Sequence, residues 1–286
     1  EADFDDRDWR TLDLPHDWGI EGPFDQKLPG ETAKLPWSGV PWYRKTFDLP
    51  ASDRGRVITL EIEGAMSYSA VWCNGRLVGG WPYGYSSYQL DLTPFLKPGA
   101  RNTLAIRLDN PKDSSRWYPG GGIYRNVWLT KTAPVAVAQW GTHVTTPEVT
   151  AATASVAISA DIANPGTTPA RVRVATQLFC ADADGHPAGK PLVASSPESL
   201  GLAAGETKPT ATTLTVAHPV LWDLEHPERY VAVTLIRQDD RLVDRYETPV
   251  GIRTIGFTAD DGFHLNGKRV PIQGVCRHAD LGALGT

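Results

Sequence analysis

Short runs with alternating apolar and polar residues, separated by turn signals, make up much of the chain. Between residues 41 and 130 these runs are WYRKTFDL, RVITLEIEG, YSAVWCNG, TLAIRLDN and YRNVWLTK. A period of two places one face of a strand in a core and the other in water. Asn74-Gly75 stands between two apolar runs, and both positions of a type I′ hairpin turn require positive φ. No stretch shows helical periodicity, so we predict an antiparallel β-sandwich with a hairpin at Asn74-Gly75.

The pattern changes in residues 135–250, where the runs are longer and rich in Val, Thr and Ala. They are TASVAISADIAN, ARVRVATQLFCA, TATTLTVA and RYVAVTLIRQ, with turn clusters such as NPGTTP and DADGHPAG between them. Eight of the ten tryptophans precede residue 130, which marks a boundary near residues 132–138. We therefore predict a second sandwich of about 110 residues, immunoglobulin-like in size and strand spacing.

A third pattern begins at residue 251. A hairpin signal at Asn266-Gly267 precedes an apolar run that ends in Gly274-Val275-Cys276, and RHADLGALGT follows. A short apolar strand followed by a polar, histidine-bearing loop is typical of the first strand of an α/β barrel. We expect three domains, at 1–133, 134–250 and 251–286. The first is expected to be truncated at its N-terminus, since the chain opens inside a domain pattern and its one Met is Met66, and the third is expected to be the truncated start of a barrel.

Composition narrows the class of partner. Hydrophobic residues make up 41% and charged residues 21%, and the formal net charge is −5. These values are ordinary for a globular protein and argue against nucleic acid or an anionic membrane as the main partner. No apolar run approaches the length of a membrane span. No signal peptide is visible, so the location stays open between periplasmic or extracellular and cytoplasmic.

Several motifs have a chemical and a structural interpretation. Cys73, Cys180 and Cys276 are far apart and odd in number, which indicates neither a metal site nor a disulfide framework. The segment Asp182-Ala-Asp184-Gly185 resembles a calcium loop but lacks its other ligand positions, so a hairpin turn is favoured. No histidine pair has zinc-site spacing, and no GxSxG indicates a serine hydrolase.

The segment SRWYPGGGIYRNVWL, residues 115–129, raises the sharpest question. A phosphate-binding glycine loop opens a helix, whereas these glycines lead into a β-like run, so we predict a tight turn. Arg116, Trp117 and Tyr118 precede the glycines. Aromatic planes stack on sugar rings and arginine donates a fixed fork of hydrogen bonds, while packing is the structural alternative.

Two further polar motifs leave alternatives open. Asp109-Asn110-Pro111 either starts a turn or begins a loop that projects polar groups toward a ligand. His16-Asp17-Trp18 contains a local His–Asp pair, which is either structural or orients the imidazole ring. Neither motif indicates a particular chemistry alone.

Several blocks together resemble glycoside hydrolase family 2, and most closely its bacterial β-galactosidase-like members. The blocks occur in the family's order and cover essentially the whole chain: LPHDW, PWYRKTF, YSSYQLDLTPFLKPGARNTLAIRLDN, SRWYPGGGIYRNVWL and GIRTIGF…FHLNGKRVPIQGVCRHADLGALG. The last block is the most specific of them.

The resemblance implies a jelly-roll sugar-binding domain, an immunoglobulin-like sandwich and then a catalytic (β/α)8 barrel. Family members hydrolyse β-glycosides with retention, using one glutamate as general acid/base and a second as nucleophile, both in the barrel. The chain would end just after the first barrel strand, so the resemblance implies that it holds neither catalytic residue and is inactive alone. It shows no evident cofactor. Some relatives use Mg or Na, whose ligands would lie mostly in the missing barrel, and the intact enzyme could be a homo-oligomer.

The resemblance also assigns sugar-binding residues. His278 matches the family's histidine at the end of the first barrel strand, which hydrogen-bonds the sugar; a structural histidine in a βα loop is the alternative. Arg277 and Asp280 are further candidates. The chain departs from many relatives at Cys276, where they have Asn, and at Ala279, where they have an acidic residue or His, which suggests a subfamily.

In this family a loop of the first domain reaches the barrel mouth, so Asp113, Arg116 and Trp117 are expected to shape the pocket for the terminal sugar. The sequence thus predicts the N-terminal portion of a retaining β-glycosidase with a carbohydrate substrate, β-galactosidase first. β-Glucuronidase and β-mannosidase are alternatives within the family. A non-catalytic carbohydrate-binding protein of two sandwiches is an alternative of another class, and it leaves residues 251–286 unexplained.

Overall fold

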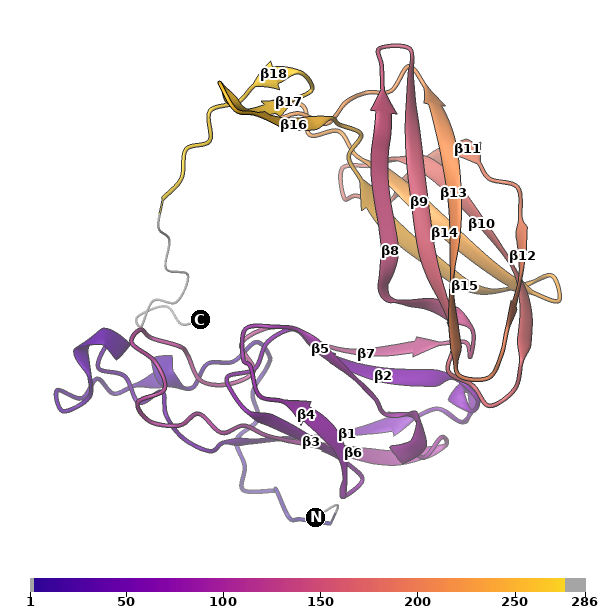
Figure 1. The fold of residues 1–286 in the computed structure, drawn as a ribbon. Coiled ribbons are helices and arrows are strands. Elements are labelled where there is room, and N and C mark those ends of the chain that lie inside the picture. The colour runs from indigo at the N-terminus through magenta and orange to yellow at the C-terminus, as the bar shows by residue number, and fades with distance from the viewer. Residues whose placement is uncertain (1–2, 276–286) are drawn as a thin grey trace. The chain divides into compact units, whose positions relative to one another are not determined.

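The computed structural model describes residues 3–275, which divide into two compact units at residues 3–131 and 132–275 (Figure 1). Both units are built from antiparallel strands. The helical elements of the described chain are single 3-10 turns, at Gly19–Glu21 (η1), Gly30–Thr32 (η2), Ala51–Asp53 (η3) and Thr93–Phe95 (η4).

The first unit is a sandwich of two sheets, seen as two layers in Figure 1. One sheet has the order β1-β6-β3-β4 and the other β5-β2-β7. The strands are β1 (Trp42–Leu49), β2 (Val57–Ile62), β3 (Ser69–Cys73), β4 (Arg76–Trp81), β5 (Tyr88–Asp91), β6 (Ala100–Arg107) and β7 (Val127–Thr132). The predicted runs therefore form strands, and Asn74 and Gly75, with φ of 51° and 82°, make the predicted hairpin between β3 and β4.

Alternation explains the core of this unit. In β2 every second residue is buried, so Ile58, Leu60 and Ile62 face inward while their neighbours are half-exposed. They pack with residues such as Val71, Ile106 and the 1% exposed Ile123. Burial of each such side chain stabilises the fold by about 1.5–3 kcal/mol.

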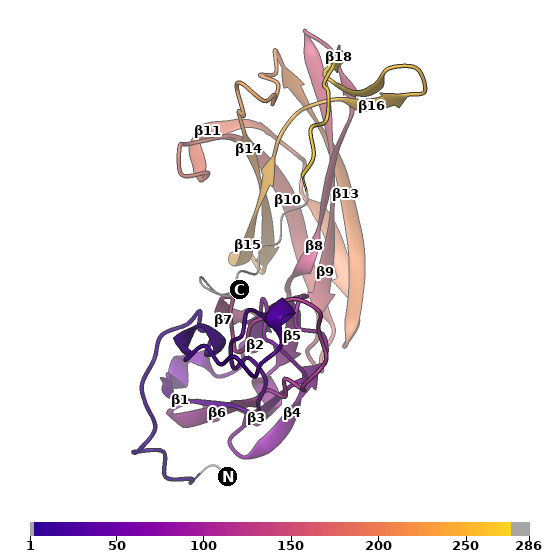
Figure 2. The same ribbon diagram turned by 90° about the vertical axis from the view of Figure 1, so that its left-hand side faces the viewer.

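The second unit is an immunoglobulin-like sandwich of a three-stranded sheet, β13-β9-β8, and a five-stranded sheet, β11-β10-β14-β15 with β12 also paired to β10. Figure 2 shows the two layers edge-on. The strands are β8 (Ala136–Val149), β9 (Thr153–Asn164), β10 (Ala170–Ala181), β11 (Pro187–Ala194), β12 (Glu198–Leu202), β13 (Glu206–Ala217), β14 (Tyr230–Gln238) and β15 (Arg241–Val250). Two apolar clusters lie between the sheets, one around Leu178 and Ile252 and one around Ile162 and Ile236.

Turns in this unit follow the sequence patterns. Asp182–Gly185 is a hairpin turn, as predicted, in which Asp182 Oδ1 accepts hydrogen bonds from Asp184 N at 3.0 Å and His186 N at 2.8 Å. A small sheet follows the sandwich and contains β16 (Ile255–Thr258), β17 (Gly262–Leu265) and β18 (Lys268–Arg269). Its second turn is the predicted Asn266-Gly267 hairpin, with φ of 50° and 74°.

Two predicted strands differ from the structure. The run after the glycines begins its strand at Val127, and residues 123–126 lie outside it because Ile123 O accepts a hydrogen bond from His16 N instead of a sheet neighbour. Residues 270–275 lie outside the assigned strands, with Ile272 73% and Val275 91% exposed. A parallel strand forms only beside its neighbours, so the first barrel strand stays a prediction.

Candidate functional site

The segment between β6 and β7, residues 108–126, carries three of the predicted sugar-binding residues. Asp113 and Arg116 are exposed, and Asp113 adopts a left-handed conformation with φ of 57°. Trp117 is 46% exposed. Its indole Nε1 donates a hydrogen bond to Tyr85 Oη at 2.8 Å, so one edge of the ring is fixed while much of the ring meets solvent.

Tyr118 points the opposite way and is only 3% exposed. Its hydroxyl donates to the Asp17 carboxylate, 2.9 Å from Oδ2, and Asp17 Oδ1 also accepts from the backbone N–H of Gly19 and of Gly121, each at 2.9 Å. Hydrogen bonds to a buried carboxylate are among the stronger ones in proteins. The structural interpretation of the His16-Asp17 pair therefore holds for Asp17. Its carboxylate binds Tyr118 and Gly121 and so attaches the segment 108–126 to the chain around residue 17.

The glycines allow two stretches of backbone to approach closely. A Cβ on Gly121 would lie 2.5 Å from Cε2 of the Trp18 indole, which is itself held by a 3.1 Å bond from Nε1 to Pro36 O. Gly122 has φ of +130°, and a Cβ there would lie 2.4 Å from His16 O. The tight-turn prediction is thus sharpened: these positions lack side chains because Trp18 and the backbone of His16 occupy that space.

The side chain of Asn110 also holds the segment 108–126 in place. It is 2% exposed, and its Nδ2 donates to Trp37 O at 2.9 Å and to Gly120 O at 2.8 Å. The hypothesis that Asp109-Asn110-Pro111 projects polar groups toward a ligand is therefore wrong for Asn110, whose side chain faces the interior. Asp113, three positions later, is exposed, as are its neighbours Lys112 and Ser114.

An aromatic loop that the sequence analysis did not single out lies beside Trp117. In this loop, Trp81-Pro-Tyr83-Gly-Tyr85, the Tyr83 and Tyr85 rings are 5.6 Å apart, and Trp81 and Tyr83 are 45% and 60% exposed. Tyr68 donates its backbone N–H to Pro82 O at 3.0 Å, has φ of 43° and is 55% exposed. The density of aromatics over residues 81–85 was the available signal. Exposed aromatic rings with polar tips are suited to the faces of sugars.

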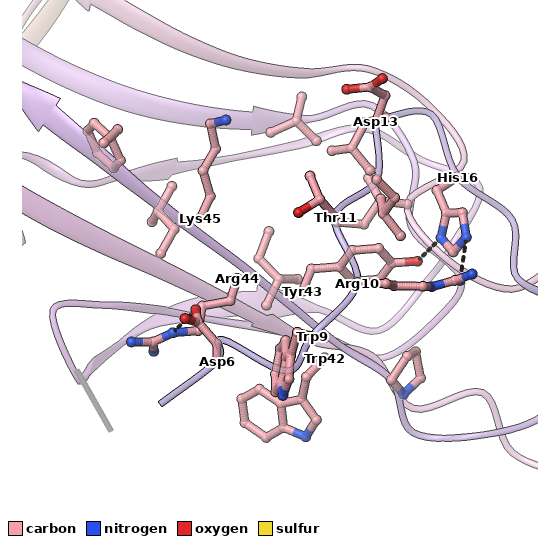
Figure 3. A pocket seen from close by; sticks show the side chains of 18 of the residues that line it. Asp6, Trp9, Arg10, Thr11, Asp13, His16, Trp42, Tyr43, Arg44 and Lys45 are labelled. Carbon is pink, nitrogen blue, oxygen red and sulfur yellow. Dashed lines mark hydrogen bonds and ion pairs between the residues drawn. The ribbon is translucent and has the colours of Figure 1, made fainter. Parts of the chain in front are cut away.

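A separate cavity of about 820 Å³ lies inside the first unit (Figure 3). At one end His16 Nδ1 and Tyr43 Oη are 2.7 Å apart, and Arg10 pairs with Glu21 at 2.8 Å. Burial raises the pKa of Tyr43 to about 12, while hydrogen bonds from Arg10 and then His16 lower the pKa of Glu21. His16, Tyr43, Arg10 and Glu21 are therefore hydrogen-bonded or ion-paired with one another at this end of the cavity.

His278, Arg277 and Asp280 lie outside the described residues. Within residues 3–275 no group of three His, Cys, Asp or Glu side chains is arranged to hold a metal ion. No helix in that part of the chain is long and apolar enough to cross a membrane.

Comparison with known proteins finds two regions of the chain that match family profiles. Residues 13–117 match the profile described as glycosyl hydrolase 2 galactose-binding domain-like, and residues 140–253 match the profile of glycosyl hydrolases family 2. The chain is 46% identical to the β-galactosidase BoGH2A of Bacteroides ovatus over 99% of its own length and 32% of that protein. It is 28% identical to a β-glucuronidase of Formosa agariphila over 96% of its length and 30% of that protein.

A solved structure of a family member has a similar fold. The crystal structure of a glycosyl hydrolase family 2 member from Bacteroides cellulosilyticus superposes with a TM-score of 0.86 at 34% identity, covering 97% of this chain and 37% of that one. The chain spans about a third of the length of the curated relatives named above. Both sandwiches match profiles of one family in the family's order, and the chain belongs to glycosyl hydrolase family 2.

Proposed function

We propose that the whole protein is a retaining β-glycosidase that releases terminal β-linked sugars, with β-galactosides as its substrates, and that residues 113–117 form one edge of its sugar pocket. The observation that carries the proposal is the exposed Trp117 ring next in sequence to the exposed Arg116. Both lie on a loop whose backbone is hydrogen-bonded to the buried side chains of Asp17 and Asn110. The 46% identity to a protein named β-galactosidase supports the choice of sugar.

The loop is suited to holding a sugar. Because Tyr85 accepts the Trp117 N–H, the ring keeps one orientation and offers its face for stacking. Arg116 can donate several hydrogen bonds to hydroxyls, and Asp113 can accept them. Preorganisation matters here, since a ring already fixed loses little entropy when a sugar stacks on it.

The bond-breaking step would use groups outside residues 1–286. In the family mechanism one carboxylic acid protonates the leaving oxygen, and a second carboxylate attacks the anomeric carbon to form a glycosyl-enzyme that water hydrolyses. We therefore expect the 286-residue chain alone to show no β-glycosidase turnover. We also assign sugar contacts to His278, Arg277 and Asp280, following the family resemblance.

The test compares Trp117→Ala and Arg116→Ala with Trp128→Ala in the whole protein. Trp128 is a matched control, since it is 53% exposed and its Nε1 also donates to a side chain, Glu63 Oε1, at 2.7 Å. On an aryl β-galactoside we expect the two loop variants to lose at least about tenfold in kcat/KM, or 1.4 kcal/mol, with an unchanged Tm. If Trp117→Ala behaves like Trp128→Ala, the assignment of the loop to the pocket fails.

A β-glucuronidase is the second candidate, because Arg116 suits a sugar carboxylate and several relatives carry that name. Planar guanidinium binds a carboxylate through two parallel hydrogen bonds, which an ammonium group cannot reproduce. Arg116→Lys should then lower kcat/KM far more on an aryl β-glucuronide than on an aryl β-galactoside. Rates on β-galactoside, β-glucuronide and β-mannoside substrates rank the candidates, and no turnover of any glycoside by the whole protein would favour the non-catalytic binding protein.

A further inference from the structure

The aromatic loop at residues 81–85, between β4 and β5, presents large rings to solvent. Tyr83 in this loop is 60% exposed, and Tyr68, whose backbone contacts the loop, is 55% exposed. Single exposed apolar groups are common on protein surfaces, whereas a group of them in one place marks a binding surface. The aromatic loop with Tyr68 is therefore a candidate binding surface.

The backbone of the aromatic loop is fixed by two hydrogen bonds and one close contact. Pro82 O accepts from Tyr68 N at 3.0 Å, and Gly84 O accepts from the Tyr124 hydroxyl at 2.8 Å. Gly84 packs directly on Met66, because a Cβ at Gly84 would lie 2.5 Å from the Met66 Sδ. A surface whose backbone is already held in place loses little conformational entropy when a ligand binds to it.

The backbone of Tyr68 adopts a conformation that residues other than glycine rarely take. Its φ is 43°, in the left-handed region. Such conformations persist where the surrounding structure enforces them, and they occur more often at ligand sites than elsewhere. Here the left-handed turn leaves the Tyr68 ring exposed at the position where its N–H binds Pro82 of the aromatic loop.

The hydroxyl groups of the exposed tyrosines differ from those of the buried ones. Among the buried ones, the Tyr124 hydroxyl donates to a backbone carbonyl, and Tyr88 Oη is 2.7 Å from Ser69 Oγ. The hydroxyls of Tyr83 and Tyr68 make no hydrogen bond to another residue within 3–275. Each exposed ring therefore offers an apolar face together with a donor and acceptor at its tip, a combination that suits a sugar, whose hydroxyls need partners.

The charge of the surrounding sequence narrows the ligand further. Residues 77–90 contain no charged side chain. Recognition of a phosphate or a carboxylate uses arginine or lysine, and recognition of a basic group uses a carboxylate. A neutral sugar needs neither, so the aromatic loop is suited to a neutral sugar.

Trp117 connects this surface to the loop that we assign to the terminal sugar. The Trp117 Nε1 donates to Tyr85 Oη at 2.8 Å, and the Tyr85 and Tyr83 rings are 5.6 Å apart. Tyr85 thus contacts both Trp117 and the exposed Tyr83. A sugar that follows one stacked on Trp117 would reach Tyr83. Because the proposed reaction releases one terminal sugar, that second ring belongs to the leaving group.

We propose that Tyr83 and Tyr68 form a second sugar-binding subsite beside the pocket edge at 113–117, and that this subsite binds a neutral sugar of the leaving group. The substrates of the whole protein would then be oligosaccharides with a β-linked terminal sugar. The proposal rests on the proposed function, since it takes the terminal sugar to lie at Trp117. Contacts to the second sugar would hold the glycosidic bond in position for cleavage.

Two substrates of the whole protein separate this subsite from the pocket of the terminal sugar. The first is the fastest of a set of neutral trisaccharides that differ in linkage and end in the sugar ranked first on aryl glycosides. The second is the β-glycosyl fluoride of that sugar, whose leaving group is a single atom. We expect Tyr83→Ala and Tyr68→Ala to lose at least about fivefold in kcat/KM on the trisaccharide and less than about twofold on the fluoride. Tyr83→Phe, which keeps the ring, should lose less than Tyr83→Ala.

Trp128→Ala is the matched control, and we expect it to leave both rates and the Tm unchanged, since Trp128 is an exposed ring on β7. Equal losses on the two substrates would place the tyrosines at the terminal sugar or in the scaffold and overturn the proposal. No loss on either substrate would also overturn it. If Trp117→Ala has no effect while the loss in Tyr83→Ala is confined to the trisaccharide, the pocket edge at 113–117 is rejected and the subsite is supported. No turnover of any glycoside rejects both.

Discussion

Replacing Gly121 with Ala tests the claim that Gly121 and Gly122 lack side chains because of close packing. The added Cβ would lie 2.5 Å from Cε2 and 2.6 Å from Cζ2 of Trp18, well inside van der Waals contact. The indole cannot swing away cheaply, because its Nε1 donates to Pro36 O and moving it would leave a donor unpaired. Overpacking of this kind costs about 1–3 kcal/mol.

That cost should appear as a Tm lower by about 4–12 °C for a unit of this size. Thermal unfolding followed by tryptophan fluorescence reports on the first unit, since eight of the ten tryptophans precede residue 130. Gly30→Ala is the matched control, because a Cβ at Gly30 has no atom within 4 Å and its φ is not positive. We expect that variant to change the Tm little.

A double variant separates the clash from a backbone effect. In a Trp18→Phe background the smaller ring removes the contacting atoms, so Gly121→Ala should cost at least about 1 kcal/mol less than in the parent. If Gly121→Ala costs no more than Gly30→Ala, or if its cost is the same in both backgrounds, the close-packing explanation is refuted.

Four further variants test other contacts. Asp17→Asn, which turns an acceptor of three hydrogen bonds into a partial donor, should cost about 3 kcal/mol in urea unfolding and Tyr118→Phe about 1 kcal/mol; equal costs would contradict a shared carboxylate. Asn110→Asp would face two carbonyl oxygens with a carboxylate, so we expect a loss of several kcal/mol at neutral pH that shrinks in acid, and a pH-independent loss would argue against it. Burial raises the pKa of Asp244, so the stability linked to its neutral form is present below the unfolded pKa and is lost as pH rises through the higher folded pKa. Asp244→Asn keeps an oxygen for Val137 N and should flatten that loss in pH-dependent unfolding; a steeper loss would contradict the assignment.

Alternation determined which parts of the fold were predictable. The runs TASVAISADIAN and ARVRVATQLFCA coincide with β9 and β10 residue for residue, because a strand between a core and water must alternate. The short β5 and β12 were missed, since four or five residues carry too little pattern, and the predicted runs also omit the longer β8, β11 and β15. Residues 123–126 were assigned to a strand because their local pattern is β-like, whereas the Ile123 carbonyl accepts from the distant His16 N and the Asn126 carbonyl from Glu63 N.

The candidate site was predictable only in part. Trp and Arg before a glycine turn suggested sugar contacts, but nothing local separates the exposed Trp117 from the buried Tyr118. The separation comes from Asp17, 101 positions away, whose carboxylate binds the Tyr118 hydroxyl. Asn110 was likewise ambiguous, because the carbonyl of Trp37 that it binds lies 73 positions away. Long-range hydrogen bonds of this kind leave no periodic trace in the sequence.

The anchoring of this loop has a consequence for how specificity diverges. Asp17 and Asn110 hold the loop partly through main-chain atoms, the N–H of Gly121 and the carbonyl of Gly120, and neither atom belongs to a side chain at 113–117. The side chains at 113–117 can therefore be exchanged while the backbone path stays the same. Under the proposed function, substitutions at 113–117 would alter which sugar is accepted before they alter the scaffold, and proteins similar to this chain carry the names of different glycosidases.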